Sequence, residues 1–149
     1  MNETDRAVVD GELIGIAVWS PPATGEAGAI SHATADHSLE ELLAVYSMGL
    51  RKRFLAFIKL LTQARDQTIQ QPFWSLAPIA APPKARGKGV ASALINKKLK
   101  ELDEARLPCF LGTQDKANVA IYEKFAFHTQ REDSISSDIT HYTMIRLRN

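Results

Sequence analysis

The sequence predicts an α+β fold in which helices flank a mixed β-sheet, all within one domain spanning residues 1–149. Three observations support this prediction. A chain of 149 residues with 45% hydrophobic residues can bury a core without disulfide bonds. Two β-prone runs near the start are joined by a hairpin turn. Further along, short apolar runs alternate with segments of helical spacing, an order that places helices across a mixed sheet.

The charge balance argues against nucleic-acid and membrane partners. Eighteen basic residues oppose 17 acidic ones, so the net charge is +1 and no basic excess is available. The most apolar run, Phe54–Leu61, is too short to span a bilayer and contains Lys59. The first five residues include Glu3 and Asp5 and no apolar run, which does not resemble a secretory signal, so we expect a cytoplasmic protein.

The cysteine and histidine residues predict no metal site. Cys109 is the single cysteine and lies in an apolar run, so we expect an unreactive buried thiol. The four histidines show no pair at a metal-ligand spacing such as i and i+4.

The first half of the chain predicts a hairpin, a loop and a long helix. Residues 7–19 form the hairpin, with Asp10-Gly11 at its turn because both residues tolerate positive φ. Ser20-Pro21-Pro22 ends the second strand, and a loop follows to about residue 37. Ser38 and Glu41 match a capping box at the start of the helix, whose apolar spacing continues to residue 61. Gly49 is a candidate break that would divide this helix in two.

The second half predicts three strands and two helices. Pro78 stands awkwardly inside the first of these strands, because proline donates no hydrogen bond to a ladder. In chain order, the expected elements are a strand over 73–81, a helix over 89–105, a strand over 108–113, a helix over 118–125, a loop over 131–138 and a strand over 140–147.

The segment Pro83–Ser92 is the most informative one, because a glycine-bearing turn before a helix leaves backbone N–H groups free for an anion. Gly87 and Gly89 let the backbone approach a pyrophosphate, and Arg86 and Lys88 add positive charge. A Walker A loop would need glycine at position 82, and a dinucleotide fingerprint would need one at position 92 together with further βα units. The chain has neither glycine.

A third interpretation fits better. Arg86-x-x-Gly89-x-Ala91 resembles the acetyl-coenzyme A (acetyl-CoA) signature of the GNAT superfamily of N-acetyltransferases, Gln/Arg-x-x-Gly-x-Gly/Ala. Residues 107–113, Asn118 and the run 121–127 are similar to the later strand and helix of that family. Within the superfamily, the Ala-Val-Trp-x-x-Pro strand end at 17–22 and a helical insertion before the coenzyme-binding strand resemble the puromycin N-acetyltransferase-like group. The resemblance spans residues 9–147.

The resemblance implies an enzyme that uses acetyl-CoA as cosubstrate and transfers the acetyl group directly to the amine of a small molecule. The backbone amides of residues 86–91 would hold the pyrophosphate, and the strand over 76–81 would pair with the pantetheine arm. Tyr122 would be the catalytic acid that protonates the departing thiolate, and Asn118 would help to position the coenzyme. The coenzyme-binding residues implied in this way are Ile79, Ala80, Ala81, Arg86, Gly87, Lys88, Gly89, Val90, Ala91, Ser92, Asn118 and Tyr122.

The sequence departs from this group in several places. Gly112 stands where the group usually has a glutamate that could serve as general base, and Ala126 stands where it has glycine. The family fold begins with a strand and two helices before the hairpin, so we expect an N-terminally truncated fold with a bare edge strand, which favours a homodimer. An alternative function follows from these departures: a protein that binds coenzyme A (CoA) but is catalytically weak or inactive.

Overall fold

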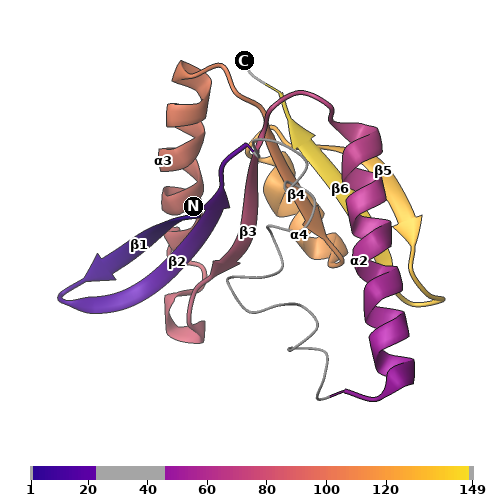
Figure 1. The fold of residues 1–149 in the computed structure, drawn as a ribbon. Coiled ribbons are helices and arrows are strands. Elements are labelled where there is room, and N and C mark those ends of the chain that lie inside the picture. Colours follow the sequence, from indigo (N-terminus) through magenta and orange to yellow (C-terminus); the bar gives the residue numbers. More distant parts are fainter. Residues whose placement is uncertain (1, 23–45, 148–149) are drawn as a thin grey trace.

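The computed structural model describes residues 2–22 and 46–147, and in this part of the chain six strands form one mixed sheet of order β1-β2-β3-β4-β6-β5 (Figure 1). Strands β3 and β4 are parallel, and the other neighbouring pairs are antiparallel. The predicted α+β class with a mixed sheet is therefore confirmed. The elements are β1 (Glu3–Val9), β2 (Glu12–Ser20), α2 (Met48–Thr68), β3 (Trp74–Ala80), a 3₁₀ turn η2 (Pro83–Ala85), α3 (Val90–Glu104), β4 (Cys109–Thr113), α4 (Lys116–Glu123), β5 (His128–Ser134) and β6 (Thr140–Arg146).

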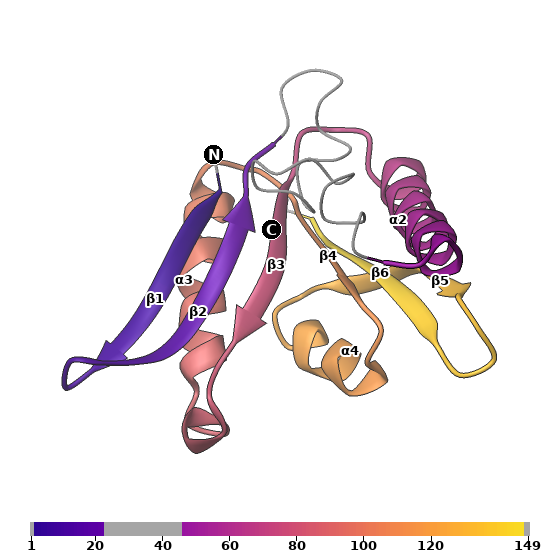
Figure 2. The same cartoon turned by 60° about the horizontal axis from the view of Figure 1, so that its bottom comes forward.

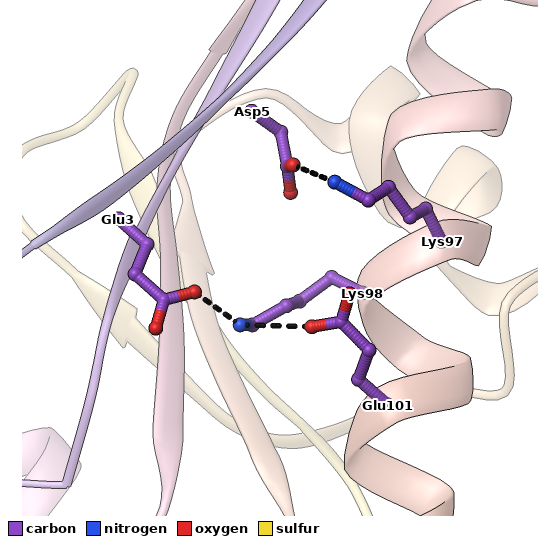
Figure 3. A network of polar contacts seen from close by, with 5 residues as sticks. All are labelled: Glu3, Asp5, Lys97, Lys98 and Glu101. Atoms are coloured by element: carbon purple, nitrogen blue, oxygen red, sulfur yellow. Dashed lines mark hydrogen bonds and ion pairs between the residues drawn. The ribbon is translucent and has the colours of Figure 1, made fainter.

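The predicted hairpin is present, with Asp10 and Gly11 both at positive φ, but β1 begins four residues earlier than expected. Its early residues are polar, and helix α3 holds them. Lys98 Nζ donates to Glu3 Oε2 at 2.5 Å, and Lys97 binds Asp5 (Figure 3). A strand whose polar side chains meet cations of a packed helix needs no apolar run, which explains why the apolar pattern missed its start.

The main core lies between the β1–β4 part of the sheet and α3. Trp19 and Phe127 are fully buried in it, as is Cys109, as predicted. The other buried members of this core are Ala17, Leu76, Ala85, Val90, Leu94, Ile95, Leu99, Leu102, Leu111 and Met144. Arg146 Nη1 and Nη2 donate to the two oxygens of Asp103 at 2.6 and 2.7 Å, which ties the last strand to the end of α3.

Helix α2 covers the opposite face at the other end of the sheet, where it contacts β5 and β6 (Figure 1). It begins at Met48, and the Ser47 hydroxyl caps it by accepting from the Leu50 N–H at 3.4 Å. Gly49 therefore lies in the first turn and breaks nothing in the described helix. The capping box expected at Ser38 and most of the loop expected before it lie outside the described residues.

The predicted loop over 131–138 is confirmed at residues 135–138 but is wrong at 131–134, because β5 continues to Ser134 and pairs with β6. The stretch looked polar, yet its alternate side chains are half-buried: Thr129, Arg131 and Asp133. Arg131 Nε donates to both carboxylate oxygens of Asp133 at 2.7 Å. Two charged residues that neutralise each other can occupy neighbouring positions on one face of a strand.

Candidate functional site

The glycine turn after β3 is shaped by positive φ angles. Gly87 has φ 72° and Gly89 has φ 77°, a region that costs other residues about 1–2 kcal/mol. Among the atoms of the structure, none lies within 4 Å of the position that a Cβ would take on either glycine. Arg86 and Lys88 are exposed on the same turn. The turn thus offers open space and two cations.

The N-terminus of α3 follows directly and has no side-chain cap, because Gly89 itself occupies the capping position. The first helical hydrogen bond runs from the Ala93 N–H to the Gly89 carbonyl at 2.9 Å. The N–H groups of Val90, Ala91 and Ser92 therefore have no acceptor in the helix. By contrast, the N–H groups of Arg86 and Lys88 already donate to carbonyls of the turn. The amides that remain for an anion come from the helix end.

Strands β3 and β4 run parallel but pair only at their beginnings, through Trp74 with Cys109 and Ser75 with Phe110. Beyond Ser75, β3 continues to Ala80 along β2, while β4 continues along β6. The two strands separate, as Figure 2 shows, and α4, which contacts β4, lies toward the far end of β4. In the described sheet, the β4-facing backbone of residues 76–80 has no ladder partner, and this free edge leads to the glycine turn.

Pro78 causes no conflict in this strand. It falls at an irregularity of the β2–β3 ladder, where Ala17 pairs with Ile79 but Trp19 pairs with Leu76. A bulge of this kind leaves an extra residue outside the regular pairing, which is a position that proline tolerates. Ile79 and Ala80 belong to β3, whereas Ala81, expected as part of the strand, follows its end.

Helix α4 begins at Lys116, two residues before the predicted start, because the Asp115 carboxylate caps it by accepting from the Ala117 N–H at 2.8 Å. Asn118 Nδ2 donates to Thr113 Oγ1 at 3.4 Å, so its amide is tied to the end of β4. Tyr122 lies one helical turn further along α4.

Tyr122 is half-buried and packs edge-on against Phe127, with 6.0 Å between ring centroids. Burial raises the pKa of its phenol above the ordinary value. The hydroxyl makes no hydrogen bond to any residue in the described part of the chain. A protonated phenol with a free hydroxyl can act as an acid near neutral pH.

Gly112 stands where the puromycin N-acetyltransferase-like group usually has a glutamate. In the structure, His141 of β6 covers this position. A Cβ at Gly112 would lie 2.5 Å from His141 Cε1 and 3.0 Å from Nε2. The imidazole is 3% exposed, and its Nδ1 lies 2.8 Å from Gln114 Nε2. Sequence reasoning considered this histidine only as a metal ligand. The register of β4 against β6, which brings residues 112 and 141 together, was the missing signal.

Residues 2–22 and 46–147 contain neither a metal-binding cluster nor a membrane-spanning helix. No group of three or more His, Cys, Asp or Glu side chains there could hold a metal ion. None of the helices described in that part of the chain has the length and apolar character of a membrane span.

Comparison with known proteins identifies the family. The model of the acetyltransferase (GNAT) family matches residues 5–127. The chain belongs to this family. GNAT acetyltransferases use acetyl-CoA as the acetyl-donating cosubstrate.

Solved structures share the fold of this GNAT chain at low sequence identity. One is a histone acetyltransferase HPA2 and related acetyltransferase from Corynebacterium glutamicum, at 19% identity and a TM-score of 0.60 over 99% of this chain and 65% of that one. Another is an acyl-CoA N-acyltransferase from Pseudomonas aeruginosa, at 17% identity and a TM-score of 0.55 over 97% of this chain and 68% of that one. A third is a NatC complex bound to Gag peptide and CoA, at 12% identity and a TM-score of 0.59 over 98% of this chain and 71% of that one. The chain therefore spans about two thirds of the length of these proteins.

Proposed function

We propose that this GNAT protein is an acetyl-CoA-dependent N-acetyltransferase that acts on the amine of a small molecule in the cytoplasm. The observation that carries the proposal is the free edge of β3, which leads from the separation of β3 and β4 to the uncapped N-terminus of α3. An extended amide-bearing chain that ends in a pyrophosphate matches both features in this order. The choice of a small-molecule acceptor rests on the likeness of residues 17–22 to the puromycin N-acetyltransferase-like group.

The residues of the glycine turn fit the coenzyme by charge and by space. The amides of Val90, Ala91 and Ser92 would donate to the pyrophosphate, with the dipole of α3 adding positive potential. Arg86 and Lys88 would neutralise its charge. The backbone of Ile79 and Ala80, with Ala81 after them, would pair with the pantetheine arm. Asn118 would keep the start of α4 against Thr113.

Direct acetyl transfer requires an acid for the leaving thiolate and a base for the amine. Bound acetyl-CoA supplies an acetyl group activated as a thioester. The ordinary pKa of a phenol lies well above neutral pH and burial raises that of Tyr122 further, so the hydroxyl carries its proton and can give it to the thiolate sulfur as the C–S bond breaks. The free edge of β3 would hold the pantetheine arm in one direction. The thioester carbonyl would then face the acceptor amine in a fixed orientation.

Isothermal titration with acetyl-CoA tests the coenzyme site. We expect binding by the unaltered chain, loss of binding in Gly89→Glu, and retained though weaker binding in Gly89→Ala. The two variants share the strain of a side chain at φ 77°, and only the glutamate adds negative charge to the anion site. Equal loss in both variants, or no binding by the folded unaltered chain, would contradict the proposed site.

A turnover assay separates catalysis from binding. Release of free CoA thiol is followed with a panel of small amines and with peptides that carry a free N-terminus. We expect turnover with a small amine and a fall in kcat of about 100-fold or more in Tyr122→Phe. Coenzyme binding without turnover of any amine would support the alternative, a CoA-binding but catalytically inactive protein, which Gly112 favours because no carboxylate stands there.

The proposal includes a homodimer. β1 is an edge strand of the described sheet, and Val8, Val9 and Leu13 near its turn are more than half exposed. An apolar edge of this kind favours pairing with a second chain. Analytical ultracentrifugation tests it, and Val9→Lys should shift the protein to monomers.

A further inference from the structure

His141 and Gly112 form a contact that no acetyltransferase motif in the sequence indicates. The imidazole lies so close to Gly112 that a Cβ there would be 2.5 Å from Cε1 and 3.0 Å from Nε2. The ring thus takes the space into which a longer side chain at position 112 would point. Gly112 itself is exposed, so solvent reaches the strand backbone next to the buried ring.

Two buried hydroxyl groups on this face of the sheet have no hydrogen-bond partner in the described structure, and one of them lies next to this contact. Thr143 is directly opposite Gly112 in the β4–β6 ladder, and it lies on the same sheet face as His141 because the two are separated by one residue. Its Oγ1 is fully buried and has no hydrogen-bond partner in the described structure. Ser75 of β3 pairs with Phe110, which lies on this face too, and its buried Oγ also lacks a partner in the described structure. Buried hydroxyls without partners are uncommon, and Thr143 Oγ1, next to the imidazole, is available to a polar group of a ligand.

The acid and the histidine reach the end of β4 from opposite faces of the sheet. Asn118 of α4 donates to Thr113, which places the helix of Tyr122 on the Thr113 face. Gly112 precedes Thr113 and faces the other way, toward His141. A donor thioester at the separation of β3 and β4 would therefore have a phenol on one side and an imidazole on the other.

We propose that His141 is the general base of the acetyl transfer, and that the Thr143 hydroxyl binds the acceptor beside it. The inference rests on the proposed N-acetyltransferase function. Nε2 takes one proton from the acceptor ammonium, and the neutral amine then attacks the carbonyl carbon. A C–N bond forms and the C–S bond breaks. Tyr122 protonates the thiolate and recovers a proton from the nitrogen, while the imidazolium releases its proton to solvent.

The hydrogen bond to Gln114 selects the required tautomer. With the side-chain amide turned so that Oε1 faces the ring, Gln114 accepts from Nδ1–H and leaves the Nε2 lone pair free. Gln114 is thus a positioning residue for the base.

The charges around the imidazole are compatible with a neutral ring. Burial lowers the pKa of His141, and the Asp133 carboxylate of β5, which pairs opposite it in the ladder, acts in the other direction. Arg131 neutralises Asp133 through two hydrogen bonds. On the packed helix α2, the buried Arg65 is paired with Asp66. A neutral imidazole is the form that accepts a proton, so catalysis should weaken on acidification.

The experiment compares His141→Gln with His128→Gln, a matched control because His128 is exposed on the neighbouring strand. Acetyl-CoA affinity is measured first by titration and should stay within about twofold in both variants, which shows that the fold and the coenzyme site are intact. The pH dependence of kcat and KM is then measured with an amine that the unaltered chain acetylates. We expect kcat to fall about 100- to 10,000-fold in His141→Gln, with loss of the acidic limb of the profile, and no change in His128→Gln.

A second pair of variants keeps the proposal testable if His141→Gln is unstable. His141→Ala should be inactive, and the double variant His141→Ala with Gly112→Glu should recover activity, because removal of the ring opens space for a carboxylate. Thr143→Val should raise KM more than it lowers kcat. Full kcat with an unchanged acidic limb in His141→Gln would overturn the assignment of the base. Absence of turnover by the unaltered, coenzyme-binding chain would overturn the proposed function and this inference with it.

Discussion

The contact between β2 and the first turn of α3 gives the sharpest prediction on stability. Gly15 of β2 faces this turn, and a Cβ at its position would lie 2.5 Å from Val90 Cγ1, 3.3 Å from Leu94 Cδ1 and 3.5 Å from the Ala80 carbonyl oxygen. Val90 and Leu94 are buried in the main core. The strand and the helix can approach this closely only because Gly15 has no side chain, so Gly15→Ala should push the start of α3 away from the sheet.

The geometry sets the size of the effect. Carbon atoms pack best at about 3.5–4.0 Å, so the Val90 methyl must move by roughly 1 Å or more. Inserting a methyl group into a packed core costs about 1–3 kcal/mol, and loss of glycine's freedom in the unfolded chain returns about 0.4–1 kcal/mol. For a chain of this length each kcal/mol lowers Tm by about 2–4 °C, so Gly15→Ala should lower Tm by several degrees.

Thermal unfolding, with Gly49→Ala as the matched control, tests this reasoning. No atom lies within 4 Å of a Cβ at Gly49, which is in the first turn of α2, so that variant should be neutral or more stable by up to about 1 kcal/mol. Adding Val90→Ala to Gly15→Ala should recover part of the lost stability, because it removes the atom in conflict. Because Val90 begins α3, acetyl-CoA affinity should fall in Gly15→Ala as well. Equal Tm values for Gly15→Ala and Gly49→Ala would refute the argument.

Three further predictions concern other parts of the fold. Ala126, which follows α4, has φ 61°, a conformation that strains alanine but not glycine. Ala126→Gly should therefore raise the free energy of unfolding, measured in urea, by up to about 1 kcal/mol, and an unchanged value would contradict strain at this position. Hydrogen bonds from Arg146 hold the pKa of Asp103 below its ordinary value, so the pair stabilises the fold at neutral pH. This contribution begins to fall below about pH 4 and is lost as the pH drops through the lowered pKa, so Asp103→Asn should be less stable at pH 7 and the difference should shrink steadily on acidification below pH 4. Burial raises the pKa of Cys109 to about 12, so a thiol reagent should label it at least about 1,000-fold more slowly than a free thiol. The labelling rate should rise with the fraction of unfolded protein, and fast labelling of the native protein would contradict the burial of Cys109.

Local patterns predicted most elements of the described fold correctly. The hairpin turn at Asp10-Gly11 and the positive φ angles of Gly87 and Gly89 follow from the conformations open to these residue types, so neighbouring residues suffice to predict them. The family followed in the same way, because its signature occupies six consecutive residues from Arg86 to Ala91. Prediction failed where a strand depends on partners from other segments: β1 was expected to begin too late without the lysines of α3, and residues 131–134 of β5 were expected to be a loop without the ladder to β6.

The sequence by itself thus determined the fold class, the glycine turn before α3 and the family, since each depends on short stretches whose backbone preferences and spacing can be read directly. Only the tertiary structure decided how β3 and β4 separate after two pairs of residues, and which side chain covers Gly112. The physical reason is register. Gly112 and His141 are far apart in the chain, and a shift of one residue between β4 and β6 would turn the imidazole to the other face of the sheet.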